Sequence, residues 1–287
     1  MSFSQVMRHD FPEEVPRPGR LAALRERIRH IEQPASHGVL PFGVAAIDRV
    51  LPDGGLALGA VHEILGIDGD EEDGAAACGF IAGLLARLRM GPVLWCVKRP
   101  DLYGPGLLAH GLDPARLVIV TAPRDEDILW AIEEGLRAPG LVAVIGEIGR
   151  LPLVAGRRLQ LAAERSGITA FLLRRWRNSE EAARERERPS AAVTRWRIAA
   201  LPAREVDDLR LRQLIGQPRW RVELLRCRGG APSQWVVESG VVESGDVEVA
   251  DATGHVCLSA ELADRPAAAL RREADRFDAE PERRHAG

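Results

Sequence analysis

The sequence predicts an α/β protein whose parallel sheet is covered by helices on both faces, and three observations support this. From Pro41 onward, short apolar segments alternate with segments of helical pattern. These segments are continuously apolar, as are strands buried on both faces. The chain has 287 residues, 46% of them hydrophobic, which is enough for a sizeable core without a disulfide or a metal.

Each element follows from its local pattern. Apolar runs between turn residues predict a buried strand at residues 59–65 and four further apolar strands at residues 92–97, 117–121, 141–145 and 168–173. Alanine- and leucine-rich or periodic segments predict the intervening helices, at residues 75–90, 104–111, 125–137 and 151–165. In the third of these helices, Ile128, Ile132 and Leu136 recur every four residues and define a buried stripe.

After residue 173 the pattern changes. A highly charged stretch is followed by strand patterns at 193–200, 220–226, 234–238 and 246–249, with Gly229 and Gly230 as a turn. We expect these strands to extend the sheet edge in antiparallel fashion. The predicted organisation is an N-terminal extension (1–38), a core (39–260) and a charged, flexible C-terminal tail (261–287).

The N-terminal extension contains one amphipathic helix. Its apolar stripe consists of Leu21, Leu24, Ile28 and Ile31, and arginines occupy the other face. Either this is a helix with a solvated face or its stripe docks on a partner.

Composition excludes several classes of protein. No apolar run approaches the roughly 20 residues that span a membrane, and the first 20 residues contain acids and no apolar signal core. The four cysteines are far apart and form no metal-binding pair. We therefore expect a cytoplasmic protein with no membrane contact, no metal and no cofactor.

The first strand leads into a sequence with the spacing of a phosphate loop. Gly69 and Gly74 stand five residues apart, but Ala75 and Ala76 occupy the places of the lysine and the hydroxyl residue that bind phosphate and Mg²⁺. Five acids between residues 68 and 73 would repel a triphosphate. A solvated acidic loop is the preferred interpretation, and conventional ATP binding or a metal site built from the acids are the alternatives.

Two further positions lack ATPase chemistry. At the end of the fourth strand, Gly146 stands where a metal-binding aspartate is expected, and Glu147 comes one residue later, on the opposite face of a strand. Lys98, Arg99 and Pro100 follow the second strand, where a carboxylate could activate water. The sequence therefore predicts a nucleotide-hydrolase framework that is not an enzyme.

Residues 174–228 contain fifteen arginines and eight acids, a net charge of +7 in a chain of net charge −3. Arginines beside tryptophans suit single-stranded nucleic acid. The candidate DNA or protein contacts are Arg174, Arg175, Trp176, Arg177, Arg195 and Arg197. Four glutamates between residues 180 and 187 favour a self-neutralised surface helix instead, with Trp196 and Trp220 in the core.

The segments around the predicted first strand resemble the RecA core. Asp48, Gly55, Gly59 and Glu63 match its pattern, in which a glycine-rich turn and a strand with an internal glutamate precede the phosphate loop. The strand at 168–173, the basic break and the segment 191–198 follow the same order, so the resemblance covers about residues 39–230. In RecA the basic break is a DNA-binding loop.

The size, the degenerate loop and the arginine-rich C-terminal part are similar to those of the ImuA family. This resemblance implies a non-catalytic accessory subunit in damage-induced, error-prone translesion synthesis. Its implied partners are an ImuB-type inactive Y-family protein, an error-prone C-family polymerase and, as a further candidate, RecA, with DNA contacted directly or through them. The alternatives are a SulA-like inhibitor of the tubulin-like division protein and an enzyme with a non-standard nucleotide mode.

Overall fold

The computed structural model describes residues 37–66, 70–88, 90–176, 179–202, 219–240 and 255–258. The predicted helix with Leu21, Leu24, Ile28 and Ile31 lies outside these residues, as do the strand expected at 246–249 and the tail from residue 261. The proposed domain boundaries therefore remain predictions. Among the described residues, no helix is long and apolar enough to cross a membrane.

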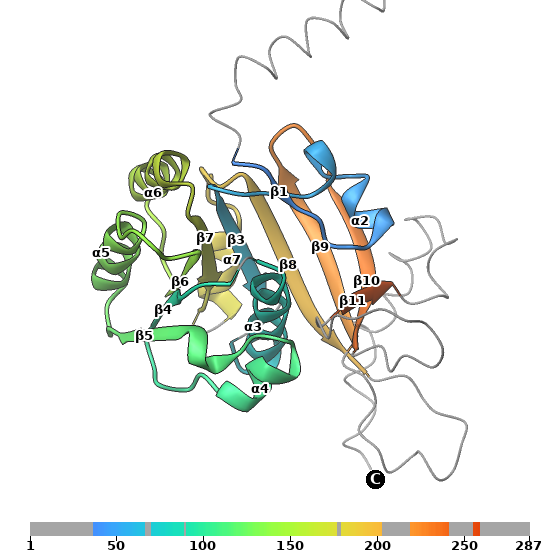
Figure 1. Cartoon of the computed structure of the whole chain (residues 1–287), viewed down its shortest axis with the longest axis horizontal. Helices are drawn as coiled ribbons and strands as arrows, with labels where there is room; N and C mark the ends of the chain where they lie inside the picture. The colour runs from blue at the N-terminus through green and yellow to red at the C-terminus, as the bar shows by residue number, and fades with distance from the viewer. Residues whose placement is uncertain are drawn as a thin grey trace, which may run out of the picture. The chain divides into compact units, whose positions relative to one another are not determined.

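A nine-stranded sheet forms the centre of the described chain (Figure 1). Its strand order is β11-β10-β9-β8-β3-β7-β6-β4-β5. The strands are β3 (Val61–Gly66), β4 (Val93–Val97), β5 (Leu117–Thr121), β6 (Ala143–Ile148), β7 (Thr169–Arg174), β8 (Thr194–Leu201), β9 (Arg219–Cys227), β10 (Ser233–Gly240) and β11 (His255–Leu258). A separate antiparallel pair joins β1 (Val39–Leu40) to β2 (Leu56–Ala57).

The strands from β8 to β5 in this order are parallel, and β9, β10 and β11 are antiparallel to their neighbours. The predicted parallel sheet with antiparallel C-terminal strands is thus confirmed. One detail is different, because β8 was expected in the antiparallel extension but pairs in parallel with β3. This pairing sets Arg195 beside Glu63 at the centre of the sheet.

Helices cover both faces of the sheet, as predicted (Figure 1). The helices are α2 (Ala45–Asp48), α3 (Asp70–Ala86), α4 (Gly104–Ala109), α5 (Asp125–Gly135), α6 (Leu153–Ser166) and α7 (Ser179–Arg186), with short 3-10 turns at Pro52–Gly54 and Pro114–Arg116. The main core lies between the sheet and α3 and α4, and includes Trp196 and Trp220 as expected. A second core lies between the sheet and α5 and α6.

Helix α3 begins at Asp70, five residues before the predicted start. Four of the five acids that were interpreted as a solvated loop, at residues 70–73, therefore belong to the first turn of this helix, and Asp68 lies outside the described residues. Acidic residues are favourable there, because the amide groups of a helix N-terminus carry partial positive charge. With this arrangement of sheet and helices, the architecture is a RecA-like α/β fold.

Candidate functional site

The end of β3 and the start of α3 form the place where a RecA-like protein would hold phosphate. Gly69 lies outside the described residues, whereas Gly74, Ala75 and Ala76 lie in α3. Ala75 is exposed and Ala76 is buried in the main core. The side chains at the two key positions of the motif are thus methyl groups, which supply neither a cation nor a metal ligand.

Side chains that follow β7 fill the space beside this helix start. Trp176 is only 5% exposed and donates a hydrogen bond from Nε1 to the carbonyl oxygen of Gly149, at 2.9 Å. The guanidinium groups of Arg174 and Arg186 lie 5.5 and 5.8 Å from the centre of its ring. The cavity bounded by Gly66, Gly74 and residues 173–176 has a volume of about 10 Å³, which is room for about one water molecule.

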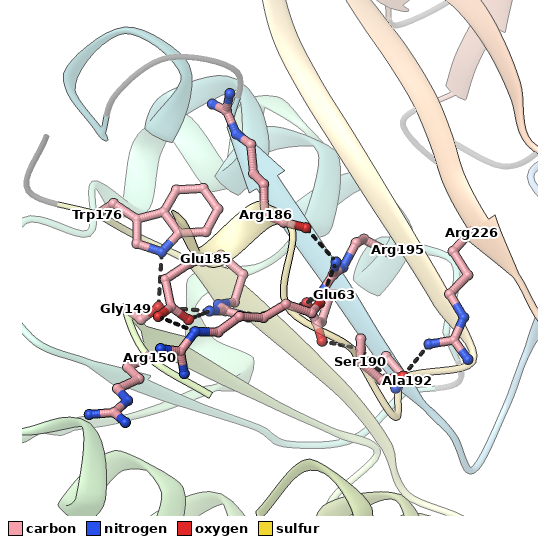
Figure 2. Close-up of polar contacts among 12 residues, drawn as sticks. Glu63, Gly149, Arg150, Trp176, Glu185, Arg186, Ser190, Ala192, Arg195 and Arg226 are labelled. Atoms are coloured by element: carbon pink, nitrogen blue, oxygen red, sulfur yellow. Dashed lines mark hydrogen bonds and ion pairs between the residues drawn. The ribbon is translucent and has the colours of Figure 1, made fainter. Parts of the chain in front are cut away.

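The buried carboxylate of Glu63 organises the segment that follows β7, as Figure 2 shows. Its Oε2 accepts hydrogen bonds from Arg195 Nη2 at 2.9 Å and from Arg174 Nη1 at 3.2 Å. Its Oε1 accepts one from the hydroxyl of Ser190, which in turn accepts from the backbone N–H of Ala192. A single residue of the central strand therefore binds three positions of the arginine-rich segment.

Arg174 and Arg195 make further contacts besides those with Glu63. Arg174 also pairs with Glu185 of α7 at 3.2 Å and donates to the carbonyl oxygen of Gly149 at 2.7 Å. Burial lowers the pKa of Arg174, and the Glu63 and Glu185 carboxylates oppose this shift. Arg195 donates to the carbonyl oxygens of Arg186 and Arg188, at 3.0 and 3.2 Å. The segment is thus held closed over the carboxyl end of β3 by ion pairs and hydrogen bonds.

The remaining candidate contact residues are also engaged within the chain. Arg175 pairs with Asp101 at 2.9 Å, and this hydrogen bond holds the pKa of Asp101 below its usual value. Arg197 donates from Nε to Glu223 at 2.9 Å, and Arg177 lies outside the described residues. Arg174, Trp176 and Arg195 are buried, so the structure presents none of these three on its surface for stacking or for phosphate contact.

The structure reverses the expected orientations of Gly146 and Glu147. Gly146 was assigned to the face of the phosphate loop, but it faces α5, and a Cβ there would lie 2.1 Å from Ile132 Cδ1. The alternation of side chains along β6 then directs Glu147 toward α3, where it lines a groove with Gly74 and Ala75. The choice of the wrong face arose because the predicted strand ended at residue 145, whereas β6 continues to Ile148.

Within this groove Glu147 is fully buried. Its Oε2 accepts a hydrogen bond from Arg175 Nη1 at 3.0 Å and a longer one from the backbone of Lys98, whereas Oε1 has no partner among the described residues. Burial raises the pKa of Glu147, and the positive charge of Arg175 only partly offsets this. The groove has a volume of about 610 Å³ and continues between α3 and α4.

Lys98 forms an ion pair with Asp125, the first residue of α5. Its Nζ lies 2.5 Å from Asp125 Oδ1, and the Asp125 carboxylate also accepts from the backbone N–H groups of Gly149 and Arg150. Burial alone would raise the pKa of Asp125, but these hydrogen bonds and the Lys98 charge lower it below its usual value. In the part of the chain that the structure describes, no cluster of three histidine, cysteine or acidic side chains could hold a metal.

Sequence reasoning did not identify Ser190, Glu185 or Asp125 as site residues. It named Arg174 and Arg195 but not their pairing with Glu63. Only the acid inside an otherwise apolar strand signalled that Glu63 needs buried partners, because an unpaired buried charge is very costly. The partners themselves are 111 to 132 residues away in the chain, and local patterns carry no information about such distances.

Comparison with known proteins assigns the family. Two Caulobacter vibrioides proteins named Protein ImuA, one from strain NA1000 / CB15N and one from strain ATCC 19089 / CIP 103742 / CB 15, are each 42% identical to this chain over 207 residues. The match covers 70% of this chain and 83% of each relative. The chain belongs to the ImuA family. No family model matches the sequence. The ImuA-family assignment agrees with the resemblance identified from the residues alone.

Proposed function

We propose that this ImuA-family chain is a non-catalytic bridging subunit of an error-prone translesion synthesis assembly. Membership of the family supports a role in the ImuA/ImuB system of damage-inducible mutagenesis. The finer proposal is that the chain links an ImuB-type inactive Y-family protein to an error-prone C-family polymerase in the cytoplasm, with RecA as a further candidate partner.

The filled phosphate position is the observation that carries the non-catalytic part of this proposal. Between Gly66, Gly74 and Trp176 there is space of only about 10 Å³, which is room for about one water molecule and not for the phosphates of a nucleotide. Opening this space requires the movement of Trp176, which is tied to Gly149, and of the ion pairs of Arg174. The arginines and the indole therefore close the space between β3 and the start of α3 on this side, which supports the proposal that no nucleotide phosphate binds there.

A nucleotide-binding measurement tests this part. Titration of the purified full chain with a fluorescent ATP analogue and Mg²⁺ should give no saturable binding at millimolar concentrations, and no ATP turnover should be detected. Turnover that disappears in Glu147→Gln or Lys98→Ala would contradict the proposal and favour the non-standard enzyme. Glu180→Gln, a change in an exposed pair of α7, is the matched control.

Capture of partners tests the bridging part. A tagged chain recovered from DNA-damaged cells should bring down an ImuB-type protein and an error-prone polymerase, identified by mass spectrometry. Recovery of the tubulin-like division protein instead would favour the SulA-like alternative.

The predicted N-terminal helix supplies a second test of bridging. Replacement of Leu24 and Ile28 by aspartate should abolish capture if the apolar stripe docks on a partner, because a buried carboxylate without a partner is costly. Alanine at Arg25 and Arg29, on the other face of the predicted helix, is the control. Unchanged capture by the aspartate variant would exclude this helix as a docking element.

A further inference from the structure

Exposed apolar side chains gather on the outer face of α5 and α6. Trp130 of α5 is 67% exposed, and Val154 and Leu161 of α6 are 69% and 52% exposed. Single exposed apolar residues are ordinary on protein surfaces, but a contiguous group that includes a tryptophan indicates a binding surface. We call the surface formed by these three residues together with Arg157 and Arg165 the α5–α6 face.

An ion pair fixes the relative height of the two helices. Glu133 of α5 pairs with Arg158 of α6, and the helices lie side by side (Figure 1). They run in the same direction, because each connects strands of the parallel sheet. Trp130 and Val154 each precede this pair by about one helical turn, so they lie at the same height, and Leu161 follows about one turn later.

On α6, the charges of the α5–α6 face that form no ion pair with a described residue are positive, and Glu126 is an exposed acid at the start of α5. On α5, Glu133 and Glu134 both pair with Arg137, and Asp127 pairs with Arg124. On α6, Arg157 and Arg165 are exposed and form no ion pair with any described residue. Val154, Arg157, Leu161 and Arg165 recur at spacings of three and four, so the outer stripe of α6 alternates apolar and cationic side chains.

We propose that the α5–α6 face binds an acidic amphipathic helix of a partner protein. The apolar stripe of such a helix would cover Trp130, Val154 and Leu161, and its carboxylates would meet Arg157 and Arg165. The spacing of the apolar side chains by helical turns matches the anchor positions of a helix laid along a groove. Glu126, an exposed acid one turn before Trp130, directs the acids of the partner toward α6.

A protein fits this surface better than a nucleic acid. Phosphates would be attracted to Arg157 and Arg165, and one base could stack on Trp130. Val154 and Leu161 offer a nucleic acid neither stacking nor charge, whereas the apolar stripe of a helix would cover them. The inference rests on the proposed bridging function, since a bridge needs docking surfaces. If variants of the α5–α6 face lose peptide binding but still capture the partner proteins from cells, the partners dock elsewhere. That result would refute the location of the docking surface and leave the bridging function intact.

Direct binding to the full chain tests the proposal with three fluorescein-labelled probes. One is an 18-residue helical peptide, about five turns long, with leucine at every third or fourth position and glutamate elsewhere. The second carries lysine in place of glutamate, and the third is a single-stranded oligonucleotide. Anisotropy should show saturable binding of the acidic peptide at micromolar concentration, weakened by salt, and no comparable binding of the other two.

Trp130 gives an independent readout. It is the exposed tryptophan of the six in the chain, since Trp95, Trp176, Trp196 and Trp220 are buried and Trp235 is partly buried. Binding of the acidic peptide should therefore reduce acrylamide quenching of the protein's fluorescence. This protection should be absent in Trp130→Phe, which removes the reporter and keeps an apolar ring.

Matched variants decide the outcome. Val154→Glu with Leu161→Glu should weaken binding of the acidic peptide at least about tenfold, whereas Leu108→Glu, a change at an equally exposed leucine of α4, should have no effect. Arg157→Glu with Arg165→Glu should reverse the preference toward the lysine peptide. Equal binding by all variants, or tighter binding of the oligonucleotide, would overturn the proposal. Since all these side chains are exposed, unchanged thermal unfolding serves as the folding control.

Discussion

Substitution of Glu63 by glutamine removes the negative charge that two buried arginines share. Arg195 and Arg174 approach its Oε2 at 2.9 and 3.2 Å, and all three residues are buried. At an effective dielectric constant of about 20, each contact contributes about 5 kcal/mol of attraction, which the cost of desolvating the ions largely offsets. Loss of one partner of a buried pair leaves this cost uncompensated, so we expect a loss of about 3–5 kcal/mol of unfolding free energy.

Urea denaturation followed by far-UV circular dichroism measures this loss. Glu180→Gln is the control, because Glu180 and Arg184 form an exposed pair at 4.0 Å, for which a change below about 0.5 kcal/mol is expected. In Glu63→Met with Arg195→Met, the remaining Arg174 retains Glu185 as its partner. This double variant should therefore be more stable than Glu63→Met alone.

A loss below about 1 kcal/mol in Glu63→Gln, similar to that of the control, would refute the reasoning. So would a double variant Glu63→Met, Arg195→Met that is less stable than the unsubstituted chain by the full sum of the two single effects, because that would mean that the charges act independently. Limited trypsin digestion gives a second readout, since the released segment after β7 should be cleaved at its arginines faster in Glu63→Gln.

Three further predictions concern buried groups. Burial lowers the pKa of His62 from 6.5 to about 4, so between these pH values the unfolded chain binds a proton that the folded chain does not. Up to about 3 kcal/mol of stability is therefore lost as the pH falls from 6.5 to 4. Denaturation at several pH values should show that the stability of His62→Gln depends less on pH. Gly146→Ala would place a Cβ 2.1 Å from Ile132 Cδ1 and should cost about 1–3 kcal/mol, less in an Ile132→Ala background. Burial raises the pKa of Cys96 to about 12, so a maleimide at pH 8 should label this thiol only after denaturation, as peptide mass spectrometry would show.

Most strands of the sheet could be predicted because the local sequence pattern of each strand is sufficient to identify it. The segment Leu117–Thr121 is apolar between turn residues, and β5 has these limits. The orientation of β8 could not be predicted in the same way, since strand direction depends on which strand it pairs with. The start of α3 was misplaced because acids suggest a loop by composition and a helix N-terminus by electrostatics.

The candidate site was only partly predictable. The absence of a lysine and a hydroxyl residue at Ala75 and Ala76 is visible in the sequence, and so is the acid at Glu63. The sequence also shows arginines beside Trp176, but it does not distinguish exposed arginines from buried ones. Only the fold reveals that Arg174 and Arg195 meet one carboxylate, because burial is a property of the assembled layers.

The central position of β3 has a consequence for the order in which the chain can fold during synthesis. Its neighbours in the sheet are β7 and β8, and Glu63 finds its arginines 111 and 132 residues later in the chain. At roughly 5–20 residues per second, a ribosome needs on the order of 10 s to deliver them. Strands β4, β5 and β6 can pair among themselves in that interval. The apolar strand β3 has no partner strand until β7 and β8 are made, so a chaperone could bind it during this time.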